Sequence, residues 1–161
     1  MDSKIKPIVI TGIHRSGTTW VGRIISNENK SVHYVYEPMH SHSPPGIPKP
    51  KFPHILYGDG GEYPDHEKAV SDILKGEFPV IGGSPIGVKR RLSLFKKSLG
   101  IRWAYLNKKR MVLKAPEALF FSDYFVNSHQ AHVIILTRHP CAFVTSCLRL
   151  NWGINLSILT R

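Results

Sequence analysis

Short apolar runs alternate with amphipathic segments along this chain of 161 residues. The apolar runs predict strands, because they are too short for helices and rich in β-branched residues. We place these strands at 8–10, 30–36, 110–114 and 132–137. Between the strands, and after the last one, apolar side chains recur at helical spacing. The predicted helical segments are 20–25, 65–74, 88–106 with an interruption at Gly100, 119–125 and 140–151.

Strands that alternate with helices predict an α/β fold, in which helices flank a parallel sheet and the crossovers are right-handed. The continuous apolar run at 132–137 suits the middle of such a sheet. The length of the chain fits a single domain spanning 1–161. Residues 38–64 are rich in Pro and Gly and predict a long irregular loop.

The chain carries a formal net charge of +11, which favours anionic ligands. Charge alone leaves open nucleotides, acidic substrates, nucleic acid and a membrane surface. No apolar run approaches the length of a membrane span, and the first residues lack the apolar core of a signal peptide. We therefore expect a cytoplasmic protein without a membrane span. Cys141 and Cys147 lie six residues apart in one predicted helix, which predicts free thiols.

A glycine-bounded loop follows the first predicted strand. Gly12 and Gly17 bracket four residues, and an amphipathic helix begins directly after them. This arrangement directs backbone N–H groups and the positive end of a helix dipole towards one point, where a phosphate can bind. The loop of nucleotide hydrolases carries a lysine after its second glycine. Here Thr18 has that position and the cation of the loop is Arg15, so the pattern disfavours a metal–triphosphate site.

Three of the predicted strands end in ionisable residues. Glu37, Lys114 and Arg138 follow these strands, and the carboxyl ends of parallel strands meet at one edge of a sheet. Together with the loop 12–19, this edge carries cations where a phosphoryl-transfer enzyme normally places a metal-binding acid. The charges suit a polyanionic nucleotide that binds without a metal, and we expect no metal requirement. Sulfuryl transfer fits this site, because a sulfuryl group carries less charge than a phosphoryl group.

Two segments resemble the nucleotide-binding motifs of the sulfotransferases that use 3′-phosphoadenosine 5′-phosphosulfate (PAPS). Residues 14–20, His-Arg-Ser-Gly-Thr-Thr-Trp, resemble their 5′-phosphosulfate loop, and residues 138–146 resemble their 3′-phosphate-binding stretch. Residues 36–39 and 113–120 are similar to segments of bacterial and carbohydrate-type members. The resemblance implies a P-loop NTPase-like sulfotransferase fold with PAPS as co-substrate. It also implies transfer of a sulfuryl group to a hydroxyl of a small molecule or carbohydrate.

The motifs imply which residues bind the nucleotide. By the resemblance, Arg138 and Ser146 bind the 3′-phosphate, while the loop binds the 5′-phosphosulfate. The full set of expected cofactor-binding residues is Gly12, His14, Arg15, Ser16, Gly17, Thr18, Thr19, Trp20, Arg138 and Ser146.

Three residues are expected to act on the reacting groups. Arg15 and the loop amides are expected to stabilise the charge that develops on the bridging oxygen. Lys114 matches a lysine that the family places near the phosphosulfate. Glu37 is the best candidate for the general base that accepts the proton of the acceptor hydroxyl, with Glu117 as the second candidate.

Members of the family are usually longer, and a later segment rich in Gly and basic residues closes over their nucleotide. The resemblance therefore implies either that this chain is a C-terminally incomplete fragment or that it is a shortened form with a half-open nucleotide site, which leaves its activity open. Two other functions also stay open: a P-loop NTPase or kinase, and a non-catalytic module that binds polyanions without preference for a 3′-phosphate. We expect no nucleic-acid partner. The sequence indicates neither the acceptor nor the oligomeric state.

Overall fold

The computed structural model describes residues 5–27, 29–38, 64–77 and 88–151. Strands and helices alternate along these residues, so the predicted α/β class is confirmed. In chain order the elements are β1 Ile8–Gly12, α1 Thr18–Ser26, β2 Val32–Tyr36, α2 Pro64–Leu74, α3 Val88–Leu106, β3 Arg110–Lys114, the 3₁₀ helix η1 Pro116–Phe121, α4 Ser122–His129, β4 His132–Leu136 and α5 Pro140–Arg149.

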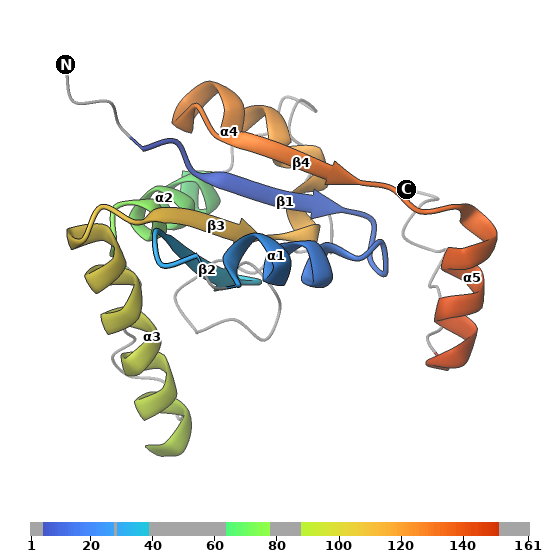
Figure 1. Cartoon of the computed structure of the whole chain (residues 1–161), viewed down its shortest axis with the longest axis horizontal. Helices are drawn as coiled ribbons and strands as arrows, with labels where there is room; N and C mark the ends of the chain where they lie inside the picture. Colours follow the sequence, from blue (N-terminus) through green and yellow to red (C-terminus); the bar gives the residue numbers. More distant parts are fainter. Residues whose placement is uncertain (1–4, 28, 39–63, 78–87, 152–161) are drawn as a thin grey trace.

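The four strands form one parallel sheet with the order β2-β3-β1-β4 (Figure 1). Lys114 of β3 is in register with Tyr36 on one side and with Ile10 on the other. Gly12, at the end of β1, is in register with Leu136 at the end of β4. The carboxyl ends of all four strands therefore lie along one edge, where open α/β sheets bind their ligands.

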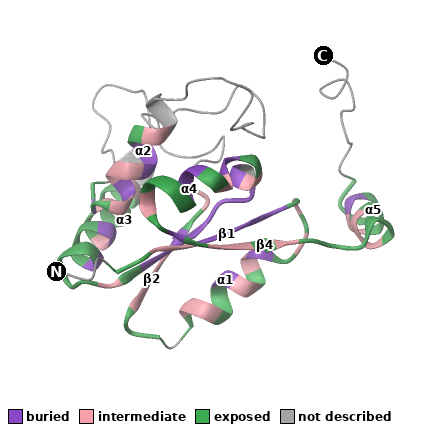
Figure 2. Cartoon of the chain, turned by 90° about the horizontal axis from the view of Figure 1, so that it is seen from above, coloured by how far each residue is buried: buried purple, intermediate pink, exposed green. Residues whose placement is uncertain are grey.

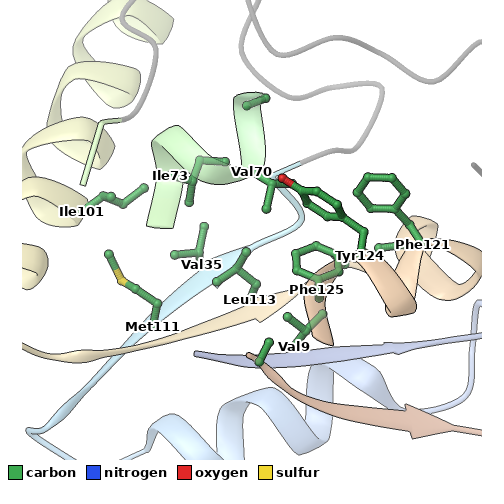
Figure 3. Close-up of a cluster of buried hydrophobic side chains, with 14 of the residues drawn as sticks. Val9, Val35, Val70, Ile73, Ile101, Met111, Leu113, Phe121, Tyr124 and Phe125 are labelled. Atoms are coloured by element: carbon green, nitrogen blue, oxygen red, sulfur yellow. The ribbon is translucent and has the colours of Figure 1, made fainter. Parts of the chain in front are cut away.

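Helices cover both faces of the sheet. α2, α3 and α4 lie on one face and α1 lies on the other, while α5 extends away from the end of β4 (Figure 2). The core fills the first of these interfaces, where Val9, Val35 and Leu113 meet the buried side of the helices (Figure 3). The aromatic part of this core is the cluster of Phe121, Tyr124 and Phe125.

The opposite face of the sheet is covered by α1. A side chain at Gly22 would place its Cβ 2.6 Å from the ring of Tyr34 on β2, so only a glycine lets this helix lie so close to the strand. Residues of α1 contact β1, β2 and β3. This close packing fixes the orientation of α1, and its N-terminus lies at the carboxyl edge of the sheet.

Two details of the sequence prediction are wrong. The apolar run of β4 does not lie in the middle of the described sheet but at its edge, where Ile135 is 52% exposed. β1 is central instead, and a continuous apolar run does not by itself distinguish the two positions. α3 is not interrupted at Gly100, because one glycine costs a helix only about 1 kcal/mol.

Three further predictions concern the irregular loop, the cysteines and membrane spans, and the described residues bear on part of them. Of the predicted irregular loop 38–64, residues 39–63 lie outside the described residues. Cys141 and Cys147 are both free, as predicted. Among the described helices, none is long and apolar enough to cross a membrane.

Candidate functional site

The loop between β1 and α1 has a backbone that depends on two glycines. Gly12 has φ 141°, and a Cβ at this position would lie 2.2 Å from the carbonyl oxygen of Leu136 on β4. Gly17 has φ 97° and caps α1, although its Cβ would meet no atom within 4 Å. Gly12 is therefore required by space and Gly17 by backbone conformation. Between them Arg15 also has a positive φ of 65°, a strained conformation that often marks functional sites.

The N-terminus of α1 is arranged to receive an anion. No side chain caps it, and its first turn contains no acidic residue. The first backbone hydrogen bond of the helix runs from the N–H of Val21 to the carbonyl of Gly17 at 3.1 Å. The Oγ of Ser16 is buried and has no hydrogen-bond partner among the described residues. Thr18 is buried and Thr19 is half-buried beside it. A phosphate or sulfate in the loop would satisfy the Ser16 hydroxyl and the helix dipole together.

Arg15 joins the loop to the two segments that follow β4. Its Nε donates a hydrogen bond to the Oγ of Ser146 on α5 at 3.0 Å. The Nη1 of Arg138 donates a hydrogen bond to the carbonyl oxygen of Arg15 at 2.7 Å. These contacts connect residues more than 120 positions apart in the sequence. The loop, Arg138 and Ser146 therefore form one cluster, which we call the loop cluster.

A second cluster lies at the ends of β2 and β3. Lys114 is only 3% exposed, and its Nζ forms an ion pair and hydrogen bond with Oε1 of Glu37. The same Nζ lies 4.7 Å from the centre of the Tyr36 ring, a cation–π contact. The backbone N–H of Glu37 also donates to the carbonyl of Lys114 at 2.9 Å, and Glu37 has a positive φ of 39°. We call Glu37, Lys114 and Tyr36 the paired cluster.

A further cation acts on the paired cluster from α3. Burial of part of its side chain lowers the pKa of Lys97, while the negative charge of Glu37 acts in the opposite direction. The Glu37 carboxylate thus lies in the field of two lysines.

Trp20 lies in the first turn of α1, on its exposed side. Its indole is 68% exposed and borders a surface cavity of about 420 Å³. The cavity is open to solvent, and an exposed aromatic ring at its edge can stack on a planar base. The residues that line the cavity are Trp20, Arg23, Ile24, Ser26 and Asn27.

The structure brings the site residues of the sequence analysis to one edge, but in two groups. Arg15, Arg138 and Ser146 make direct contacts, as do Glu37 and Lys114. β2 and β4 are the two outer strands, so their ends are separated by about 14 Å at the usual strand spacing. His14 is half-buried beside the loop. Nothing is described of the Glu117 side chain.

Sequence reasoning missed two features of this site. It treated Glu37 and Lys114 as separate groups, whereas they form a pair that Tyr36 covers. The register of β2 with β3 is needed to see this pair, and no local pattern encodes it. It also gave no structural reason for including Trp20, although an exposed aromatic residue directly after a phosphate loop is a signal for base stacking.

No protein-family model, curated protein or solved structure matches this chain. Within the described residues there is no group of three or more His, Cys, Asp or Glu side chains that could hold a metal ion.

Proposed function

We propose that this chain is the nucleotide-binding core of a PAPS-dependent sulfotransferase with a P-loop NTPase-like fold. The observation that carries the proposal is the loop cluster. Arg15 donates to Ser146, and Arg138 donates to the backbone of Arg15, so the two motifs that resemble the 5′- and 3′-phosphate sites of the family lie together. Two neighbouring anion sites match a nucleotide with phosphate groups at both its 5′ and 3′ positions.

The contacts support a position for each anion. The N-terminus of α1, with the unpartnered Oγ of Ser16, would hold the 5′-phosphosulfate. Arg138 and Ser146, on the far side of Arg15, would hold the 3′-phosphate. Trp20 offers an exposed ring on which the adenine base can stack.

The reaction is a displacement at sulfur. The hydroxyl oxygen of the acceptor forms a bond to sulfur while the bond between sulfur and the bridging oxygen breaks. The electron pair of the broken bond leaves with adenosine 3′,5′-bisphosphate, and the hydroxyl proton passes to the Glu37 carboxylate. Arg15 and the loop N–H groups stabilise the charge on the bridging oxygen, and Lys114 holds the carboxylate in position. The acceptor is a small molecule or carbohydrate with a free hydroxyl group.

The test is calorimetric titration with two ligands that differ only in one group, adenosine 3′,5′-bisphosphate and adenosine 5′-monophosphate. We expect the bisphosphate to bind roughly ten- to a hundredfold more tightly, because Arg138 and Ser146 add charge-assisted hydrogen bonds. Arg138→Ala should remove most of this difference. Arg149→Ala, which changes an exposed arginine at the end of α5, the helix that carries Ser146, is the matched control and should preserve it.

Two results would contradict the proposal. Tighter binding of ATP with Mg²⁺ than of the bisphosphate would favour a P-loop NTPase or kinase, despite the absence of the loop lysine. Equal binding of both adenosine ligands, with strong dependence on salt, would favour a non-catalytic polyanion-binding module. If the bisphosphate preference holds, sulfate transfer from PAPS to a panel of hydroxyl acceptors, compared between the natural chain and Glu37→Gln, tests the base.

A further inference from the structure

α3 carries apolar side chains on two opposite sides. The inner side packs into the core, where Ile101 and Ala104 are fully buried and Leu94 packs against them. Because an α-helix turns by about 100° per residue, residues such as Leu92 and Leu99 point nearly opposite to Ile101. A surface helix that packs on one side only needs one apolar stripe. The second stripe therefore requires its own explanation.

The second stripe runs along the whole helix and is exposed. Leu92, Leu99 and Leu106 are seven residues apart, nearly two turns, so they stack in one row. Phe95 and Trp103 broaden this row on either side. All five side chains are about half exposed or more. We call these five residues the outer stripe. The N-terminal half of α3 projects beyond the sheet (Figure 1).

Positive charge surrounds the outer stripe. From Val88 to Arg110 the sequence contains nine basic residues and no acidic one. Lys96 and Arg102 fall on opposite flanks of the stripe by helical spacing. The Nζ of Lys109 lies 4.2 Å from the centre of the Trp103 ring. The basic residues are Lys89, Arg90, Arg91, Lys96, Lys97, Arg102, Lys108, Lys109 and Arg110.

We propose that the outer stripe docks α3 onto an anionic bilayer surface, with the helix lying in the plane of the interface. This inference is independent of the proposed enzymatic function. On its exposed side, α3 combines an apolar row of Leu, Phe and Trp with two basic flanks, which is what the contact face of an interfacial helix presents, while its other side packs into the core. The apolar side chains enter the headgroup region, while the lysines and arginines extend to the anionic headgroups.

Charge decides against a second copy of the chain as the occupant. Two outer stripes face to face would bring Lys96 and Arg102 of both copies together without any acidic partner on α3, and like charges in an interface are strongly unfavourable. Leu92, Phe95 and Leu99 follow the spacing of a coiled-coil seam, and the next position in this spacing is Arg102. In a pair of helices this arginine would be buried. At a bilayer surface the same arginine reaches the headgroups and remains solvated.

The first test measures whether Trp103 enters a bilayer. In a Trp20→Phe/Trp152→Phe background Trp103 is the remaining tryptophan. Vesicles of phosphatidylcholine with about one-third phosphatidylglycerol should shift its emission to shorter wavelength and bind the protein at least about tenfold more tightly than vesicles of phosphatidylcholine alone. Equal binding to both vesicles, or binding without an emission shift, would overturn the proposal.

The second test separates the outer stripe from the rest of the basic surface. Leu99→Ser should weaken binding to the anionic vesicles by about tenfold. Val126→Ser on α4 is the matched control, since Val126 is 47% exposed and Leu99 is 53% exposed, and it should change binding less than about twofold. Both variants alter exposed side chains, and circular dichroism verifies that they fold. Equal losses in the two variants would contradict the proposal.

Two other occupants give distinct results. Sedimentation velocity that shows a dimer, lost in Leu99→Ser, would replace the bilayer by a second copy of the chain. An emission shift of Trp103 with polyglutamate but not with anionic vesicles would replace it by an acidic protein surface. Either result overturns the proposal.

Discussion

The loop cluster and the paired cluster lie on the same edge of one sheet, yet they treat charge in opposite ways. In the loop cluster, Arg15 and Arg138 are exposed, and their described contacts are a hydroxyl and a backbone carbonyl. In the paired cluster, Lys114 is buried and bonded to the carboxylate of Glu37. The loop cluster therefore presents positive charge to solvent, whereas the paired cluster neutralises its positive charge internally.

This difference separates two tasks. Exposed contacts between polar side chains contribute little to folding stability, so the loop cluster can exchange them for a ligand at small cost. A buried pair costs much to break, because removing one partner leaves the other charged in the interior. We infer that the loop cluster captures the anionic nucleotide and that the paired cluster holds a carboxylate in fixed position. The four predictions below test this division.

The largest effect is expected for Lys114→Met. It removes the buried cation that forms the ion pair with the Glu37 carboxylate, which is 17% exposed, and should destabilise the fold by about 4 kcal/mol. Urea unfolding measures this loss. The double variant Lys114→Met/Glu37→Gln removes both charges and should recover part of it. If the free energy of unfolding of Lys114→Met lay within about 0.5 kcal/mol of that of the natural chain, the ion pair of the paired cluster would contribute no more to stability than the exposed contacts of the loop cluster.

The next largest effect is expected for Gly12→Ala, which tests whether the close contact of Gly12 with β4 anchors the loop cluster to the sheet. Its Cβ would collide with the carbonyl oxygen of Leu136, so we expect a loss of about 3 kcal/mol. Gly17→Ala is the matched control, because its Cβ meets no atom, and it should cost only about 1 kcal/mol for the left-handed backbone. Equal losses of stability in Gly12→Ala and Gly17→Ala, measured by thermal or urea unfolding, would mean that the backbone of β4 moves away from the new Cβ at little cost.

Ser146→Ala should affect binding and not folding. It removes the hydroxyl that accepts the hydrogen bond from Arg15, and we expect affinity for adenosine 3′,5′-bisphosphate to fall about fivefold with little change in stability. Thr145→Ala is the control on the same helix, since its hydroxyl donates to the carbonyl of Cys141 and not to the loop cluster. A Ser146 variant that unfolds more easily but binds normally would assign this contact to the fold.

The smallest effect is expected for Tyr34→Phe, on the β2 side of the sheet. Burial raises the pKa of Tyr34 to about 12, with Tyr36 and Glu37 adding to the rise and Arg23 opposing it. Between about pH 10 and 12 the unfolded chain loses this proton while the folded chain keeps it, so stability falls as pH rises through this window. Urea midpoints at pH 8 and pH 11 should differ less in Tyr34→Phe than in the natural chain.

Tyr105→Phe, which alters an exposed tyrosine on α3, is the control for the pH series. At neutral pH, Tyr34→Phe should cost little, because the buried hydroxyl has no partner among the described residues. An unchanged pH dependence in Tyr34→Phe would contradict the burial of this group.

Local patterns predicted the elements of the fold, and long-range pairing decided their arrangement. The strand, loop and helix around Gly12 and Gly17 follow from backbone chemistry, and the structure places them as expected. The edge position of β4 could not be predicted, because strand order depends on which crossovers pack best over the whole sheet. The pairing of Glu37 with Lys114 was missed for the same reason, since it depends on the register of two strands.

The loop cluster was accessible to sequence analysis in part. Arg15 and Arg138 were assigned to an anion site from the loop pattern and the strand ends, whereas Ser146 was assigned to the 3′-phosphate by resemblance alone. The hydrogen bonds among them are properties of the folded chain, since they need the parallel pairing of β1 with β4 to bring the segments together. The sequence thus indicated the residues of the cluster, and the contacts among them follow from the pairing of β1 with β4.

The central position of β1 has a consequence for how the protein is made. β1 is synthesised first among the strands, but both of its neighbours, β3 and β4, come from the last third of the chain. At ribosomal speeds this strand waits roughly ten seconds before its partners have emerged. During that time its apolar face and its glycine loop have no sheet to join. We therefore expect the segment around β1 to be open to chaperone binding until β3 and β4 have emerged.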